Sequence, residues 1–267
     1  MILNDVLDRI EKKYPLHLQY SWDNSGLNIG DRKQNIEKVL LTLEVTEKTV
    51  DEAIEKDVDL IISHHPFMFS KTNRIIKDDI KGGIIYKLIA NSISVYCMHT
   101  SYDIAFDGLN DYFMKLIDAE DVYVFEEEGS EESYEGGRKY GLGRVGKLKK
   151  TVTSGEMIEI LKKKLNIDSV RYIGDENRKI STVAVVTGSG AEFFEGLAQK
   201  GIDALITGDM KYHQAMDAIS EGATVIDCGH YGSEHIFADS IIDFLKKEMP
   251  EMKIEISENI IDPFKVV

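Results

Sequence analysis

The sequence has few of the features that mark secreted, membrane-spanning or nucleic-acid-binding proteins. Its 267 residues include two cysteines, too few for a disulfide framework. No apolar run reaches about 18 residues, so no transmembrane helix is expected. Lys and Arg number 32 against 47 Asp and Glu, and the net charge of −15 leaves no basic face for a nucleic-acid backbone. These absences favour a protein of the reducing cytoplasm without a membrane or nucleic-acid partner.

Apolar segments of strand length alternate with segments of helix length. Strands are predicted at residues 39–43, 60–62 and 93–97, and helices at residues 46–56 and 83–90. Alternation of this kind implies parallel strands joined by right-handed crossovers. We therefore expect an α/β fold with mostly parallel central sheets.

A long segment of the first half recurs in the second half. Residues 36–63 align with residues 180–207 at a constant offset of 144, and both read apolar strand, helix, aspartate, apolar strand and turn. Unrelated strand-helix-strand units would share that apolar pattern, but a second repeated motif favours duplication. We expect two related α/β lobes, at residues 1–125 and 181–267, joined by an acidic loop and connecting segment at residues 126–180. The lobes are expected to pack as one compact unit.

The second repeated motif combines histidine with a carboxylate. Each copy is a cysteine, any residue, a histidine and, four residues after the histidine, an acid. The copies are Cys97-Met98-His99 with Asp103 and, at an offset of 131, Cys228-Gly229-His230 with Glu234. A third cluster, His64-His65-Pro66, supplies two further imidazoles. Neutral imidazole and carboxylate together are ligands of Zn, Mn or Fe, and we expect both cysteines to be buried and unligated.

These histidines all follow predicted strands. His64 and His65 follow the strand at 60–62, His99 the strand at 93–97 and His230 the strand at 224–227. Ligands of open α/β sheets bind beyond the carboxyl ends of the strands. Ser233 is predicted to cap the last helix, which would place Glu234 in its first turn. Each residue has an ordinary structural explanation alone, but together they predict a metal site between the lobes.

Other residues are candidates for catalysis or substrate binding. The candidates for proton transfer, or for orienting a metal ligand, are His99, Asp209 and His213. A solvated helix position explains His213 equally simply. Trp22, Asp23 and Asn24 are candidates to line a pocket and stack on a base, although a packed turn explains them about as well. Gly188-Ser189-Gly190 precedes a predicted helix and is a weak anion-binding signal.

The motifs together resemble the NIF-three-like family, also called dinuclear metal center proteins or GTP cyclohydrolase 1 type 2 homologs. The resemblance runs nearly the whole chain, through SWDNSGL, LIISHHPFMF, MHTSYD, GLGRVG, VAVVTGSG, LITGDMKYHQA and DCGHYGSEH. It implies two divalent metal ions per chain, held by His64, His65, Asp103, His230 and Glu234. Their identity as Zn, Fe, Mn or Co stays open. The resemblance also implies a homohexamer.

The resemblance and the ligand types favour a metal-dependent hydrolase. The leading hypothesis is hydrolysis of a nucleotide-like or phosphorylated small molecule. GTP cyclohydrolase chemistry would hydrolyse the purine ring of GTP and release formate. The alternative is a metal-handling protein or an interaction scaffold without turnover. An accessible metal position near base or phosphate contacts favours the enzyme, whereas exchangeable ions and a partner-dependent surface favour the alternative.

Overall fold

The computed structural model describes residues 1–132 and 134–266; Ser133 of the predicted acidic loop and Val267 of the predicted second lobe lie outside the described residues. The chain forms two compact units. The first comprises Met1–Ala105 and Phe237–Ile261, and the second comprises Phe106–Ile236 and Asp262–Val267. The predicted boundaries after residues 125 and 180 therefore fall inside the second unit. Among the described residues, no helix combines the length and apolar character needed to cross a membrane.

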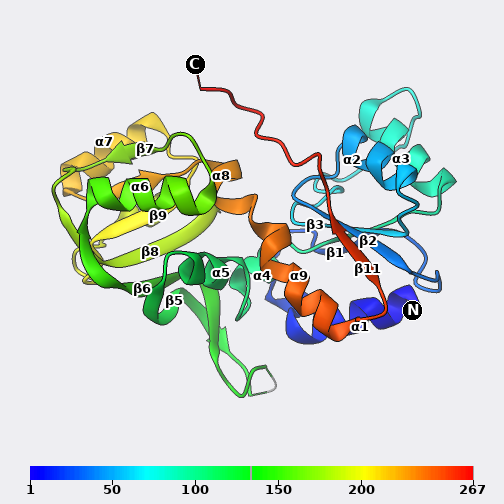
Figure 1. Cartoon of the computed structure of the whole chain (residues 1–267), viewed down its shortest axis with the longest axis horizontal. Coiled ribbons are helices and arrows are strands. Elements are labelled where there is room, and N and C mark those ends of the chain that lie inside the picture. Colours follow the sequence, from blue (N-terminus) through cyan, green and yellow to red (C-terminus); the bar gives the residue numbers. More distant parts are fainter. Residues whose placement is uncertain (133, 267) are drawn as a thin grey trace. The chain divides into compact units, whose positions relative to one another are not determined.

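A five-stranded sheet forms the centre of the first unit, in the order β1-β4-β3-β2-β11 (Figure 1). The strands are β1 (Gly26–Ile29), β2 (Lys38–Thr42), β3 (Leu60–Ser63), β4 (Ser94–Cys97) and β11 (Lys253–Ile256). Strand β1 is antiparallel to β4, and the other four strands are parallel. Every residue of β3 and β4 is buried, as expected for a parallel sheet covered on both faces.

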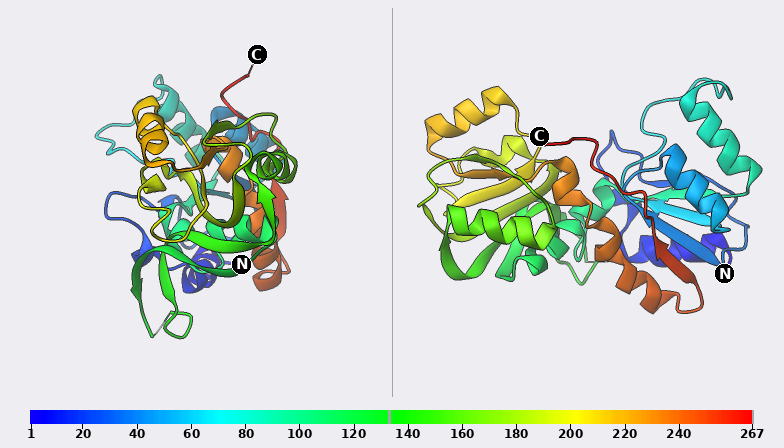
Figure 2. Two further views of the ribbon diagram at one scale, coloured as in Figure 1. Left: turned by 90° about the vertical axis from the view of Figure 1, so that its left-hand side faces the viewer. Right: turned by 45° about the horizontal axis from the view of Figure 1, so that its top comes forward.

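Helices cover both faces of this sheet. Helices α2 (Glu47–Glu55) and α3 (Ile80–Ala90) lie on one face, and α1 (Leu3–Lys13) and α9 (Phe237–Glu248) lie on the other (Figures 1 and 2). The unit also contains the 3-10 helix η1 (Leu16–Leu18) and the short helix α4 (Thr100–Ile104). The predicted start of α2 is confirmed, because the Thr46 hydroxyl accepts a hydrogen bond from the Thr49 N–H.

A six-stranded sheet forms the centre of the second unit, in the order β5-β6-β8-β9-β10-β7. The strands are β5 (Ala119–Ser130), β6 (Lys139–Thr153), β7 (Arg171–Ile173), β8 (Lys179–Ser189), β9 (Ala204–Gly208) and β10 (Val225–Asp227). Strands β8, β9 and β10 are parallel, and the remaining pairs are antiparallel. The α/β class with parallel strands in both sheets is confirmed, but the predicted acidic loop is partly wrong, because β5 continues to Ser130.

Helices also pack on both faces of the second sheet. They are α5 (Leu109–Leu116), α6 (Ser154–Leu165), η2 (Ala191–Phe194), α7 (Tyr212–Glu221) and α8 (His230–Glu234). The cap predicted at Ser233 is wrong. Ser233 lies inside α8, where its hydroxyl donates to the Gly229 carbonyl oxygen four residues earlier instead of accepting from an N–H group ahead.

The offset of 144 recurs in the backbone pairing of the two units. Strands β2 and β3 pair in the same parallel register as β8 and β9. Asp59 and Asp203, which the offset relates, also make the same contacts. Through one carboxylate oxygen, each accepts two backbone N–H groups of the preceding strand segment, at 2.8 and 2.9 Å. A shared apolar pattern does not require these carboxylate contacts, so they support a duplication.

The helix of the repeat does not recur in the second unit. Residues 47–55 form α2, whereas residues 191–199 form η2 followed by turns. Gly196 stands where the first copy has Glu52, and its φ of +70° lies in the left-handed region that a right-handed helix excludes. The predicted helix in this segment was therefore wrong.

The cysteine-histidine motif is shifted by one residue between its copies. Cys97 pairs with Ser63 across β4 and β3, but Asp227, not Cys228, pairs with the equivalent Thr207 across β10 and β9. The structural offset is 130, and it also relates α4 to α8. The predicted offset of 131 was wrong, because it aligned the two cysteines by residue type. Both cysteines are buried, as expected, and neither forms a disulfide.

Buried Glu52 joins α2 to the chain that follows β11. Its carboxylate accepts hydrogen bonds from the Lys56 ammonium, the Ser257 hydroxyl, the Glu258 backbone N–H and the Asn259 amide. Burial alone would raise the pKa of this carboxyl group. The hydrogen bonds outweigh burial and lower the pKa to about 2.

We expect Glu52 to make the free energy of unfolding pH-dependent in acid. The folded pKa lies below the unfolded value of about 4.3, so this stabilisation is complete above that value and is lost as the pH falls towards 2. Glu52→Gln should cost about 1–3 kcal/mol near neutral pH and flatten the pH dependence of the unfolding free energy between about pH 5 and 2. Glu55→Gln, exposed on the same helix, is the control. Urea unfolding at several pH values measures the free energy of unfolding of both variants. A wild-type dependence of that free energy on pH in Glu52→Gln would contradict this role.

Candidate metal centre

Two imidazoles follow β3 in the first unit. Their ring centroids lie 5.0 Å apart. The His64 Nδ1 donates to the Met98 carbonyl oxygen at 2.8 Å, and the His65 Nδ1 bonds the Glu44 carboxylate at 2.6 Å. Donation through Nδ1 leaves the lone pair of a neutral imidazole on Nε2. Histidine ligands of metal ions show this pattern, with one ring nitrogen on the metal and the other fixed by a carbonyl or carboxylate.

Asp103 adds a carboxylate to these imidazoles. It lies in α4 and is 7% exposed. Its Oδ1 faces the His64 Nε2 at 3.7 Å, which is longer than a hydrogen bond. Two ligands of one tetrahedral ion, each about 2.1 Å from it, lie roughly 3.4 Å apart. The separation is therefore close to what a shared ion requires.

His99 caps α4 and borders the same imidazoles. Its ring centroid lies 5.4 Å from that of His64 and 5.6 Å from that of His65. Its Nδ1 bonds the Asp23 carboxylate at 2.8 Å. The structure thus places His99 beside the ligand candidates and gives it the same carboxylate support.

Asp23 anchors its own segment of the chain to the start of α4. Its side chain is fully buried, and one carboxylate oxygen accepts the Thr100 backbone N–H at 3.1 Å and the Ser25 hydroxyl at 2.8 Å. Burial alone would raise the pKa of the Asp23 carboxyl group. The hydrogen bonds from His99, Thr100 and Ser25, together with the attraction of His99, outweigh burial and hold the pKa well below its ordinary value.

The second unit pairs His230 with Glu234. They are the first and last residues of α8, and the His230 Nε2 lies 2.9 Å from the Glu234 Oε2. Residues four apart share one face of a helix. This corrects the prediction that Glu234 belongs to the first turn of the last helix. The His230 Nδ1 bonds the Asp209 carboxylate at 2.8 Å, so Asp209 orients this imidazole as Glu44 orients His65.

Gly188, at the end of β8, leaves room for the Glu234 carboxylate. A Cβ atom on Gly188 would lie 2.1 Å from the Glu234 Oε1 and 3.4 Å from the His230 Nε2. Its φ is +68°, and its N–H donates to the Ser233 hydroxyl at 2.9 Å. The Gly188-Ser189-Gly190 segment therefore helps to position an acidic side chain.

Sequence reasoning missed Glu44 and Asp227. Glu44 lies in the loop after β2, and no local pattern distinguishes it from other exposed acids. Asp227 ends β10, and its buried carboxylate accepts the Met210 N–H at 3.0 Å and the Gly229 N–H at 2.8 Å. It therefore holds the segment that carries Asp209 and the segment that leads into His230. An aspartate ending an apolar strand was the available signal for Asp227.

The remaining sequence candidates lie in two places. His213 is exposed on α7, with its ring against that of Tyr212 at 5.4 Å. Trp22 is 57% exposed, and its ring centroid lies 6.0 Å from that of His99. The Asn24 amide donates to the Met68 carbonyl oxygen at 2.8 Å.

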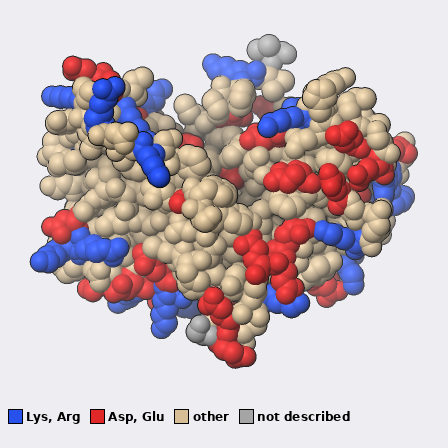
Figure 3. Space-filling view, turned by 180° about the vertical axis from the view of Figure 1, so that it is seen from behind, with Lys and Arg blue, Asp and Glu red and all other residues tan. Residues whose placement is uncertain are grey.

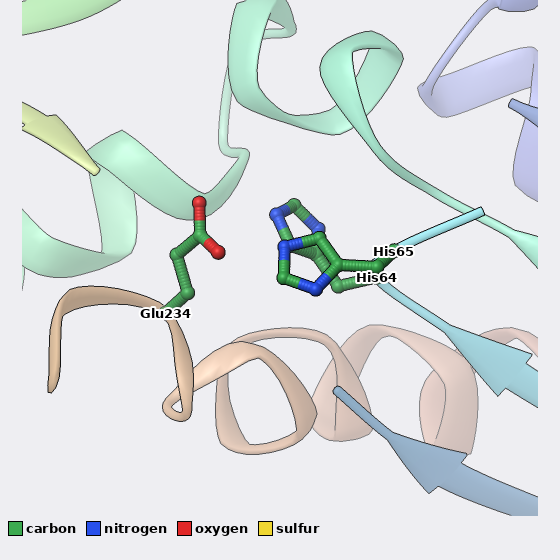
Figure 4. A group of neighbouring side chains, drawn as sticks. All are labelled: His64, His65 and Glu234. Atoms are coloured by element: carbon green, nitrogen blue, oxygen red, sulfur yellow. The ribbon is translucent and has the colours of Figure 1, made fainter. Parts of the chain in front are cut away.

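His64, His65 and Glu234 make up a group that can hold a metal ion, with one ligand atom from each side chain (Figure 4). In Figure 4 the two imidazoles leave the chain just after β3, and the Glu234 carboxylate leaves α8. The donors are nitrogen and oxygen without thiolate, which fits Zn, Fe, Mn or Co. Fold and site together define an α/β protein with an imidazole-carboxylate metal-binding group.

Comparison with known proteins identifies the family. The family model Duf34/NIF3 (NGG1p interacting factor 3) matches residues 1–263, and this chain belongs to that family. It is similar to the GTP cyclohydrolase 1 type 2 homolog of Clostridium acetobutylicum, with 36% identity over 98% of both chains. The homolog of Clostridium perfringens is 35% identical over the full length of both chains. The crystal structure of a Bacillus cereus protein related to NIF3 superimposes with a TM-score of 0.91, at 26% identity and over 99% of both chains.

Proposed function

We propose that this chain is a metal-dependent hydrolase of a nucleotide-like or phosphorylated small molecule, of the GTP cyclohydrolase 1 type 2 kind. One observation carries the proposal. His64, His65 and His230 each bond a carbonyl or carboxylate through Nδ1, which directs Nε2 to the metal-binding role. Three imidazoles oriented in the same way, with carboxylates beside them, would not be expected of histidines without a shared role.

The proposed ligands of two divalent ions are the five residues that the family resemblance implies. They are His64, His65, Asp103, His230 and Glu234. The contacts of 3.7 Å between His64 and Asp103 and of 2.9 Å between His230 and Glu234 support this set, because each unit pairs an imidazole with a carboxylate. When bound, the ions would supply Lewis-acid activation and neutralise phosphate charge.

The other polar residues have supporting roles in this proposal. Asp209 and Glu44 bond the Nδ1 of His230 and His65, which orients each Nε2 for a metal. His99 is our candidate for proton transfer, because its ring borders both imidazoles and Asp23 fixes its Nδ1. His213, exposed on α7, is a weaker candidate for the same role.

Charge restricts how such a substrate binds. The chain carries a net charge of −15, and acidic side chains form several groups on the face shown in Figure 3. A phosphate group is repelled by this field unless cations stand close to it. Substrate binding should therefore depend on the metal ions. Trp22 and Asn24 are proposed to form the substrate end of the site, which the exposure of Trp22 supports, whereas Asp23 is buried and would position their loop.

A substrate screen tests the proposed function. Protein purified without a metal-affinity tag and loaded separately with Zn, Mn, Fe or Co is incubated with GTP, other nucleotides and simple phosphoesters. Formate and phosphate release are measured. We expect metal-dependent turnover of a nucleotide that His64→Ala abolishes and His17→Ala, at an exposed position, retains. Metal-loaded protein that turns over none of these compounds would contradict the hydrolase and favour the metal-handling or interaction protein.

We further propose, from the resemblance, a cytoplasmic homohexamer. Light scattering of the protein as it elutes from a size-exclusion column measures its mass directly. A mass of one chain would contradict the hexamer.

A further inference from the structure

Two large aromatic side chains of the first unit stand in solvent beside the metal-ligand candidates. Trp22 is 57% exposed and Phe69 is 54% exposed, and their ring centroids lie 6.2 Å apart at an interplanar angle of 66°. Exposing this much aromatic surface is unfavourable in water. The position of the pair, rather than its exposure alone, points to a ligand.

A chain of ring contacts connects Trp22 to the metal-ligand candidates. The Trp22 ring lies 6.0 Å from the His99 ring, which lies 5.4 Å from His64 and 5.6 Å from His65. Tyr20 stacks on Trp22 at 5.4 Å and 21°. Tyr20 thus supports the indole from one side and His99 meets it at an edge. A flat molecule stacked on the indole would lie within a few ring widths of the imidazoles.

The loop that carries Trp22 is held in place by hydrogen bonds of the two residues that follow Trp22. Asp23, the next residue, is buried and bonds the start of α4 through Thr100. Asn24 donates to the Met68 carbonyl oxygen at 2.8 Å, and Met68 in turn donates its N–H to Asn28 at 2.9 Å. These bonds tie the segment bearing Phe69 to the segment bearing Trp22. A platform fixed before binding loses little conformational entropy when a ligand arrives.

We propose that Trp22 and Phe69 form an aromatic platform for the purine ring of a nucleotide, with the ring stacked on the Trp22 indole, met edge-on by Phe69 and held beside the metal-ligand imidazoles. This inference rests on the proposed function and names the substrate class and a residue, Phe69, that the sequence did not suggest. Aromatic side chains bind the π-face of a base without charge. A chain with a net charge of −15 gains from recognising a nucleotide by its ring. A purine offers a larger face than a pyrimidine.

Trp22 is the only tryptophan of the chain, so its fluorescence reports on the platform directly. Metal-loaded protein is titrated with guanosine monophosphate, cytidine monophosphate and ribose 5-phosphate. We expect a saturable change with the guanine nucleotide, weaker binding of the cytidine nucleotide, and no comparable binding of the sugar phosphate. Phe69→Leu should weaken guanine nucleotide binding about tenfold. Tyr86→Leu, at a half-exposed aromatic on α3, should leave it unchanged. Trp22→Leu, followed by calorimetry, should weaken it at least as much as Phe69→Leu.

Metal content measured on the same variants separates the two proposals. Unchanged metal content with weakened guanine binding in Phe69→Leu and Trp22→Leu supports the platform. Equal binding of ribose 5-phosphate and guanosine monophosphate, or wild-type affinity in both variants, would overturn it even if the protein proves to be a hydrolase. Saturable guanine binding without turnover of any nucleotide would leave the platform standing and overturn the hydrolase.

Discussion

His64→Ala and Glu234→Gln are each expected to lower the affinity for a divalent transition metal by at least about 100-fold. Loss of a residue that merely orients a ligand costs about 10- to 100-fold, so loss of a ligand should cost at least as much. His64 is fully buried and Glu234 is 3% exposed, so water does not readily replace either side chain. Competition with a chromophoric chelator, using Zn or Co, measures the affinity.

Matched variants separate ligand loss from general damage. His17→Ala removes an exposed imidazole, and Glu221→Gln neutralises an exposed acid of the second unit. Both should retain wild-type affinity. Circular dichroism and the unfolding midpoint show whether His64→Ala still folds, and Glu234→Gln preserves side-chain volume if it does not. Wild-type metal affinity in a folded Glu234→Gln would remove this carboxylate from the ligand set.

Gly188→Ala is expected to weaken metal binding about 10- to 100-fold although glycine offers no ligand atom. The added Cβ would lie 2.1 Å from the Glu234 Oε1, so the carboxylate must leave its present position beside His230. Alanine at a φ of +68° also costs about 1–2 kcal/mol of stability. Chelator competition measures the first effect and urea unfolding the second.

Gly222→Ala is the control for Gly188→Ala. Gly222 has the same φ of +68°, but a Cβ atom there would meet nothing within 4 Å. It should therefore lose stability like Gly188→Ala while keeping wild-type metal affinity. Equal metal affinities in the two variants would show that a clash between the added Cβ and the Glu234 carboxylate does not affect metal binding.

The strand pairing was predictable because short apolar segments recur at a constant offset and pair in the same way within each repeat. Asp59 and Asp203 repeat at the offset of 144 and make the same backbone contacts. The helix failed to repeat because a single glycine, Gly196, takes a left-handed conformation. A general apolar pattern does not reveal that local change.

The motif register was harder to predict because backbone hydrogen bonds, not residue types, define it. The Met98 N–H bonds the Ser63 carbonyl, and the Cys228 N–H bonds the equivalent Thr207 carbonyl, both at 2.8 Å. Cys228 therefore matches Met98 rather than Cys97. Sequence also placed the histidines at strand ends, where the topology puts them. It could not find Glu44, because its contact with His65 joins positions 21 residues apart and depends on the folded loop.

The metal content of protein purified without a metal-affinity tag tests the central claim most directly. Elemental analysis of the wild-type chain should find about two transition-metal ions per chain, the number that a dinuclear centre requires. The paired imidazole-carboxylate contacts of the two units lead to the same expectation. A single ion per chain would contradict the dinuclear centre, and protein that neither contains nor takes up such ions would contradict the metal site itself.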